Sequence, residues 1–232
     1  MSIVAIITAR GGSKRIPKKN IKEFYGKPMI VYAIDAALSS GVFDDVMVST
    51  DSLEIAETAK KYGASVPFMR SDKTANDYAT TYDVLEEVLL EYAKIGKKFD
   101  EVCCIYPCVP FLTSDTLKKS YEEFKSKKAI AIQPVCKFPS PIEWAMKIKD
   151  GYLVPNDVEL MKKRSQDLEF AYFDVGMFYI CKVDSLLKER TLVPNKTVPY
   201  IIDETECQDI DTLEDWKMAE LKYKLIRGNL NA

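Results

Sequence analysis

Six basic side chains and two adjacent glycines lie in one short stretch near the start of the chain. The stretch TARGGSKRIPKKN covers residues 8–20, and residues 1–22 hold six lysines or arginines and no acid. The remaining residues hold 27 basic and 35 acidic side chains, a net charge of −8. Gly11 and Gly12 would let backbone N–H groups approach an anion closely. The stretch therefore predicts a polyphosphate site, with a solvated loop of surface lysines as the alternative.

The spacing of this loop excludes two common nucleotide motifs. A Walker loop needs GxxxxGK[ST], and a dinucleotide-binding fingerprint needs GxGxxG. Neither pattern occurs around Gly11 and Gly12. A phosphate site here would therefore belong to another class of nucleotide-binding protein.

A second candidate is the acidic sequence Asp209-Ile210-Asp211. Alternate residues of an extended segment point the same way, so both carboxylates could face one cation. Two carboxylates together with substrate phosphates are a common way to hold Mg²⁺. The alternative is that Asp211 or Thr212 caps the following helix, while Asp209 faces solvent.

The chain contains no histidine and six cysteines. The lack of histidine excludes Ser-His-Asp and Cys-His catalysis and His-ligated metal sites. No two cysteines form a CxxC pair, which excludes a zinc ribbon and a thioredoxin motif. We expect free thiols in a reduced core, and chemistry that relies on carboxylates, cations, hydroxyls, the backbone or a bound metal.

Composition narrows the class of protein further. The 232 residues are 47% hydrophobic, which is enough for the core of one domain. A net charge of −2 argues against a general binder of nucleic acid or membrane surfaces. No apolar run approaches the roughly 18–20 residues of a membrane span, and the short apolar start does not resemble a signal peptide. We expect a cytoplasmic protein.

Apolar runs alternate with helical patterns along most of the chain. Ile3 to Thr8 has the continuous apolar character of a strand buried on both faces. Further strands are predicted near 46–49, 66–69, 102–106 and 129–135, with helices between them. This alternation predicts an α/β sandwich with a mostly parallel sheet. Such sheets bind ligands at the carboxyl ends of their strands, where the basic loop begins.

The alternation ends after residue 135. Residues 136–170 contain several prolines and an Asp150-Gly151 turn between short alternating runs, which predicts an inserted β-ribbon. The main sheet is expected to resume over 171–181. Thr212 and Asp215 form a plausible capping box for a last helix. We predict one domain over residues 1–232, with 136–170 as the insert.

Several motifs together resemble a known family. They are the basic loop, GKPMI at 26–30, VSTD at 48–51, RSQDLEFAYFDVGMFY at 164–179 and QDIDTLEDWKMAE at 208–220. The chain resembles sugar nucleotidyltransferases, and among them the CMP-sialic acid synthetase (acylneuraminate cytidylyltransferase) family. The last two motifs are most similar to pseudaminic acid cytidylyltransferases.

The resemblance implies a Rossmann-like nucleotidyltransferase sandwich whose inserted β-ribbon serves dimerisation. It implies that CTP and a nine-carbon α-keto-acid sugar, with pseudaminic acid favoured, give the CMP-sugar and pyrophosphate. Asp209 and Asp211 would hold Mg²⁺, and the enzyme would be a homodimer. The alternatives are a CMP-sialic or CMP-legionaminic acid synthetase, a catalytically silent nucleotide-binding protein, and a metal-dependent glycosyltransferase.

The resemblance also implies roles for individual positions. The implied catalytic residues are Arg10, Lys19, Asp209 and Asp211. The implied nucleotide-binding residues are Ala9, Arg10, Gly11, Gly12, Lys14, Lys19, Asn20, Arg70, Asp77, Thr80 and Thr81. The implied sugar-binding residues are Tyr106, Arg164, Gln166, Tyr172, Asp174 and Tyr179. Tyr106 stands where sialic acid enzymes often have Gln, and Phe173 and Met177 stand where the pseudaminic pattern has His and Gln.

Overall fold

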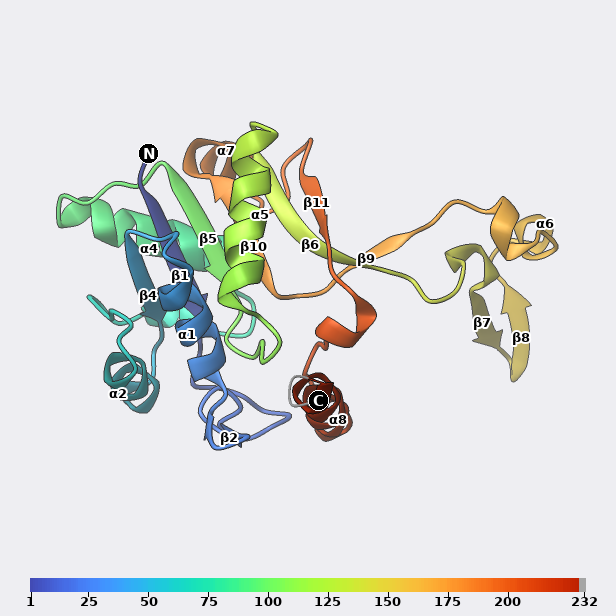
Figure 1. The fold of residues 1–232 in the computed structure, drawn as a ribbon, viewed down its shortest axis with the longest axis horizontal. Coiled ribbons are helices and arrows are strands. Elements are labelled where there is room, and N and C mark those ends of the chain that lie inside the picture. The colour runs from blue at the N-terminus through green and yellow to red at the C-terminus, as the bar shows by residue number, and fades with distance from the viewer. Residues whose placement is uncertain (230–232) are drawn as a thin grey trace.

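The computed structural model describes residues 1–229, with side chains to residue 226. Residues 230–232 of the predicted domain lie outside the described residues. A seven-stranded sheet forms the centre of the molecule (Figure 1). Its strands are β1 (Ile3–Thr8), β4 (Asp45–Ser49), β5 (Glu101–Ile105), β6 (Ala131–Lys137), β9 (Tyr172–Asp174), β10 (Phe178–Lys182) and β11 (Val198–Ile201).

The strand order is β11-β6-β10-β5-β1-β4, and β9 pairs with the far end of β6. β1 is parallel to both β4 and β5, and β11 is parallel to β6. β10 is antiparallel to β5 and β6, and β9 is antiparallel to β6. The predicted α/β class with a mostly parallel sheet is therefore confirmed.

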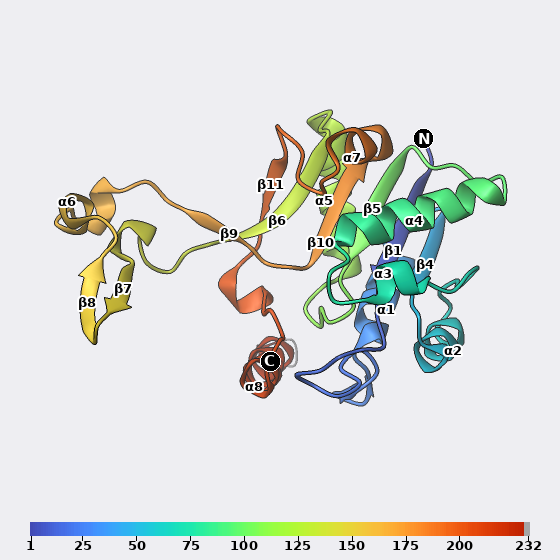
Figure 2. The same cartoon turned by 180° about the vertical axis from the view of Figure 1, so that it is seen from behind.

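Helices cover both faces of the sheet. α1 and α5 lie on one face (Figure 1), while α4 and α7 lie on the other (Figure 2). The helices are α1 (Ile30–Ser40), α2 (Leu53–Lys61), α3 (Asp72–Ala75), α4 (Thr81–Lys94), α5 (Ser114–Ser126), α6 (Val158–Met161), α7 (Val183–Glu189) and α8 (Leu213–Asn229). No helix within residues 1–229 is both long and apolar enough to cross a membrane.

β1 shows why the chain forms this layered core. Ile3, Ala5 and Ile7 belong to the cluster that packs against α1 and α5. The intervening residues Val4 and Ile6 belong to the cluster that packs against α4. A strand that packs on both faces needs apolar residues at every position, as its sequence has.

Local side-chain hydrogen bonds fix where several helices begin. Thr80 and Asp83 form a capping box at the start of α4. Thr212 and Asp215 do the same at α8: the Thr212 backbone N–H donates to Asp215 Oδ2 at 2.7 Å, and the Asp215 N–H donates to Thr212 Oγ1 at 3.2 Å. The predicted capping box of the last helix is confirmed. It holds the backbone next to Asp211 in a defined position.

The segment between β6 and β9 projects from the body of the molecule, and we call residues 138–171 the arm (Figure 1). Its hairpin joins β7 (Met146–Lys149) to β8 (Tyr152–Pro155) through Asp150 and Gly151, both with positive φ. The arm also holds α6 and the 3₁₀ turns η1 (Ile142–Trp144) and η2 (Ser165–Asp167). Cys136 and Lys137, which the predicted insert includes, belong to β6 and pair with β9.

Two expected strands differ in the structure. Residues 66–69 form no strand, and the β-pairing of this region with β4 is an isolated bridge between Met47 and Ser65. The expected strand over 171–181 is divided into β9 and β10. The Gly176 N–H donates to Asp174 Oδ1 at 2.8 Å, and Gly176 has a φ of +60°. This turn ends β9 before β10 begins.

The smaller elements complete the chain. β2 (Glu23–Phe24) and β3 (Lys27–Pro28) form a short antiparallel pair after the basic loop. The 3₁₀ turn η3 (Glu204–Glu206) joins β11 to the segment before α8. The aromatic residues Phe24, Tyr32, Trp216 and Tyr223 pack edge-on together. This cluster packs α8 against the region that follows the loop, which brings Asp211 toward the loop.

Candidate active site

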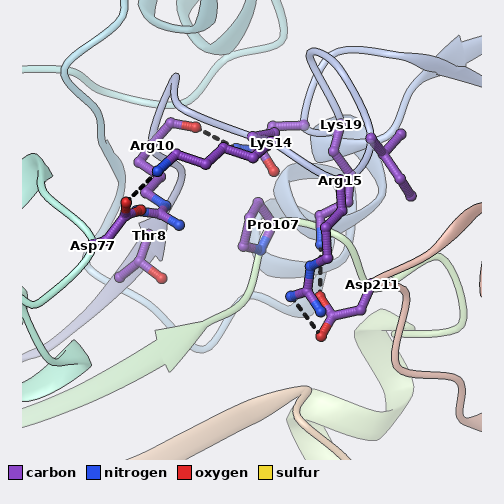
Figure 3. Close-up of a pocket in the computed structure, with 11 residues that line it drawn as sticks. Thr8, Arg10, Lys14, Arg15, Lys19, Asp77, Pro107 and Asp211 are labelled. Atoms are coloured by element: carbon purple, nitrogen blue, oxygen red, sulfur yellow. Dashed lines mark hydrogen bonds and ion pairs between the residues drawn. The ribbon is translucent and has the colours of Figure 1, made fainter.

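A pocket of about 410 Å³ lies at the carboxyl ends of β1 and β5 (Figure 3). The basic loop forms much of its wall, and Asp211 reaches it from the segment before α8. Open α/β sheets place their ligand sites at this end of the strands. The pocket is lined by Thr8, Arg10, Ser13, Lys14, Arg15, Ile16, Lys19, Asn20, Asp77, Pro107 and Asp211.

Asp77 pairs with two cations of the loop. Arg10 Nη1 lies 2.6 Å from one of its carboxylate oxygens, and Lys14 Nζ lies 2.5 Å from the other. Hydrogen bonds from Lys14 and then from Arg10 lower the pKa of Asp77. Asp77 therefore stays ionised and holds both cations on one side of the pocket. Both cations keep contact with solvent, since the side chain of Arg10 is 40% exposed and that of Lys14 is 77% exposed.

Asp211 pairs with the other two cations. Arg15 Nη2 lies 2.9 Å from Asp211 Oδ2, and Lys19 Nζ lies 3.3 Å from Asp211 Oδ1. Lys19 also donates to the backbone oxygen of Ile210 at 2.6 Å. The sequence analysis assigned no role to Arg15. Its place beside Lys14 in the basic loop could have marked Arg15 as a site residue. Its contact with Asp211 depends on the tertiary fold.

Of the two predicted metal ligands, Asp211 lines the pocket, whereas Asp209 is not among its lining residues. Partial burial, followed by the charge of Asp211, raises the pKa of Asp209. A cation between two such carboxylates would relieve their repulsion, and oxygen ligands suit Mg²⁺. Among residues 1–229, no three or more His, Cys, Asp or Glu side chains gather into a metal-binding group. Mg²⁺ would therefore need ligands from substrate phosphates as well as from Asp209 and Asp211.

The glycines of the loop do not line the pocket. The Gly11 N–H donates to Asp51 Oδ1 at 2.8 Å, so it faces a carboxylate of the chain itself. A Cβ atom added to Gly11 would lie 3.1 Å from Ser52 Cβ, so a larger residue would crowd the neighbouring loop. A Cβ atom added to Gly12 would have no other atom within 4 Å. Ala9 is fully buried. The structure thus gives Gly11 a role in packing against the neighbouring loop.

Arg70, Thr80 and Thr81 lie outside the pocket lining. Arg70 is 8% exposed and donates to the Ser49 side chain and backbone oxygen at 3.0 and 2.7 Å. Its burial lowers its pKa. The Thr80 hydroxyl is engaged in capping α4. Thr81 is the first residue of α4, and its hydroxyl lies 3.3 Å from the hydroxyl of Tyr106.

Tyr106, Asp174 and Tyr179 form one connected group. The Tyr179 hydroxyl donates to Asp174 Oδ2 at 2.5 Å, and the rings of Tyr106 and Tyr179 meet edge-on at 5.6 Å. Burial, and then the hydrogen bond to Asp174, raise the pKa of Tyr179. Tyr106 directly precedes Pro107, which lines the pocket.

The other residues of the 172–179 segment differ in role. Tyr172 is 43% exposed on β9. Phe173 packs against Phe138 with ring centroids 5.0 Å apart. Met177 and Phe178 belong to the core and are 3% and 0% exposed. Met177, which stands where the pseudaminic pattern has Gln, is thus buried in the core.

Arg164 and Gln166 are not brought to the pocket within one chain. Both lie in the arm at η2, and neither is among the residues that line the pocket. Arg164 pairs with Asp167 through two hydrogen bonds of 2.8 and 3.1 Å. Gln166 lines a separate hollow with Lys137, Phe138 and Phe170. Their separation from Tyr179 follows from the projection of the arm, which sequence proximity does not reveal.

Comparisons with known proteins agree with this architecture. A family model described as Cytidylyltransferase matches residues 4–164. The chain is 38% identical to a pseudaminic acid cytidylyltransferase of Campylobacter jejuni, with 97% of each chain covered. It is 34% identical to a CMP-N,N'-diacetyllegionaminic acid synthase of Legionella pneumophila, again with 97% of each covered.

A solved structure shares the fold at low sequence identity. It is a CMP:2-keto-3-deoxy-manno-octonic acid synthetase complexed with CTP, with a TM-score of 0.69 and 17% identity. The match covers 95% of this chain and 98% of that one. The predicted nucleotidyltransferase sandwich is confirmed by this likeness. From the family match and the two relatives, the chain belongs to the cytidylyltransferase family.

Proposed function

We propose that the protein transfers the cytidylyl group of CTP to a nine-carbon α-keto-acid sugar, with pseudaminic acid preferred. The anomeric oxygen of the sugar attacks the α-phosphorus. The bond from that phosphorus to the bridging oxygen breaks, pyrophosphate leaves, and the sugar hydroxyl loses its proton. The observation that carries this proposal is the pocket that gathers Arg10, Lys14, Arg15, Lys19 and Asp211 at the end of β1.

The side chains of the loop would act by placing positive charge. Phosphoryl transfer is accelerated chiefly by positioning and by electrostatic stabilisation. Lys19 is the least exposed of the four cations, at 21% of its side chain. It would face the leaving pyrophosphate, while Arg10 and Lys14 exchange Asp77 for phosphate oxygens. Mg²⁺ held by Asp209 and Asp211 would screen the phosphate charge and acidify the attacking hydroxyl.

We predict that kcat/KM is roughly 10- to 100-fold higher for pseudaminic acid than for sialic acid. The preference is modest because sialic acid carries additional hydroxyls, which an apolar surface rejects only weakly. Tyr106 presents an aromatic ring beside Pro107, and the relative named for pseudaminic acid is 38% identical. Pyrophosphate release from CTP with each of pseudaminic, legionaminic and sialic acid measures the order.

The same assay separates the alternatives. CTP without sugar is the control and should release little pyrophosphate. Preference for sialic acid would contradict the substrate assignment and point instead to the differences at Phe173 and Met177. Binding of CTP without pyrophosphate release from any sugar would indicate a silent nucleotide-binding protein.

We also propose that the protein is a homodimer joined through the arm. The hairpin of the arm exposes Ile148 at 77% and Leu153 at 66%. A two-stranded hairpin is marginally stable alone, and an exposed apolar face favours a partner surface. A second copy would cover this face, and its arm would carry Arg164 and Gln166 toward the group of Tyr106, Asp174 and Tyr179 in the first copy.

Ile148→Asp combined with Leu153→Asp should convert the dimer to a monomer, because charged side chains would have to be buried in the interface. Light scattering after gel filtration at micromolar concentration measures this. Ile95→Asp is the matched control, since Ile95 is 58% exposed at the end of α4, outside the arm. A monomeric wild-type protein would contradict the proposal.

A further inference from the structure

Asn20 is a buried polar side chain at the base of the pocket. It is 4% exposed and contributes to the pocket lining. Its side-chain Nδ2 donates to the backbone oxygen of Arg10 at 2.8 Å. Its own backbone oxygen accepts from the Ile30 N–H at 2.7 Å. Asn20 therefore ties the start of the phosphate loop to the first turn of α1.

Cys108 supplies the other hydrogen bond of the Asn20 amide. Cys108 follows Pro107 beyond the end of β5, and its Sγ donates to Asn20 Oδ1 at 3.3 Å. Burial of the thiol raises the pKa of Cys108 to about 12. At neutral pH the thiol is thus protonated and keeps its hydrogen to donate. The reaction proposed above makes no use of this thiol.

These two contacts select one orientation of the amide. With Oδ1 toward Cys108 and Nδ2 toward Arg10, each group meets a complementary partner. A flipped amide would place Oδ1 against the Arg10 carbonyl, so two acceptors would face each other in a buried site. An unpaired buried polar group is destabilising. The thiol donor therefore favours the orientation that holds the Arg10 backbone in place.

We propose that Cys108 is a positioning residue for nucleotide binding: through Asn20 it fixes the backbone at Arg10 and hence the geometry of the phosphate loop. This inference rests on the proposed function, because it concerns binding of CTP in that pocket. It makes Cys108 a source of binding affinity that acts without touching the nucleotide. The required property is a hydrogen-bond donor at residue 108, so serine should replace cysteine.

The test compares Cys108→Ala, which removes the donor, with Cys108→Ser, which keeps one. Titration calorimetry with CTP should give a Kd about 5-fold weaker for Cys108→Ala and within about 2-fold of wild type for Cys108→Ser, as expected for one hydrogen bond. In steady-state assays the KM for CTP should rise in Cys108→Ala, while kcat and the KM for the sugar stay near wild type. Cys181→Ala is the control, because it removes a buried thiol from β10.

The outcomes separate this inference from the proposed function. A wild-type protein that binds no CTP would overturn both. With CTP bound by wild type, an unchanged Kd in Cys108→Ala would overturn the positioning role alone. Equal weakening in Cys108→Ser and Cys108→Ala would also overturn it, because the effect would then come from packing of the sulfur. Thermal unfolding of each variant shows whether a loss of affinity arises without a loss of fold.

Discussion

Asp211→Asn should lower kcat by roughly 100- to 1,000-fold, the size expected when a group that organises charge at the reacting phosphate is removed. The substitution keeps the shape of the side chain but removes the negative charge that Arg15 and Lys19 contact. It would also remove one of the two carboxylates proposed for Mg²⁺. Pyrophosphate release with saturating CTP and sugar measures the effect, and Asp209→Asn should be severe as well.

The control for this prediction is Asp35→Asn. Asp35 forms a partly exposed ion pair with Lys27 outside the pocket, so its loss should leave kcat within about 2-fold of wild type. The affinity for Mn²⁺, measured by paramagnetic relaxation of water protons, should fall in Asp211→Asn and stay unchanged in Asp35→Asn. Near-wild-type turnover in Asp211→Asn, with a folded protein, would show that this carboxylate has no part in the reaction.

Lys19→Ala should lower kcat/KM for CTP by a factor equivalent to about 2.7–4 kcal/mol, as for a donor aimed at developing charge. Lys19 is held in position by the Ile210 carbonyl at 2.6 Å and by Asp211. Its ammonium group is therefore preorganised toward the pocket. Arg10→Ala should have an effect of the same direction. Steady-state kinetics with varied CTP provides the measurement.

Lys18→Ala is the matched comparison, one residue away in the same loop. Lys18 has a φ of +52°, and its Nζ lies 2.7 and 2.9 Å from the two carboxylate oxygens of Glu54. It does not line the pocket. Its loss should change kcat/KM by no more than about 3-fold, since exposed ion pairs contribute little. Similar small losses at Lys18, Lys19 and Arg10 would indicate a diffuse basic patch instead of a specific site.

Composition alone does not show which cations of the basic loop face the pocket. The run of cations at 10–22 was evident in the sequence, yet it does not show which of them faces the pocket. The family resemblance assigns Lys19 and not Lys18 to the site, and the fold adds the contacts: Lys18 faces Glu54, while Lys19 faces Asp211. Adjacent residues in a loop can point in opposite directions, because their directions depend on backbone angles that composition does not encode.

The sequence by itself determined the features that depend on near neighbours. The apolar run Ile3–Thr8 is β1, the Asp150-Gly151 turn joins β7 to β8, and Thr212 with Asp215 caps α8. Each of these rests on side chains within a few positions of one another, so local pattern is enough to predict it. The family could also be recognised from the sequence, because its motifs are continuous stretches of residues.

Only the tertiary structure decided which distant residues meet. Lys19 and Asp211 are 192 positions apart, and they meet because α8 packs beside the region that follows the loop. The hydrogen bonds from the Gly11 N–H to Asp51 and from Cys108 to Asn20 likewise join residues that are distant in the sequence. Arg164 lies in the arm outside the pocket lining, although its motif continues to Tyr179 of β10. Such contacts depend on strand order and on the path of the chain between elements, which near-neighbour patterns do not specify.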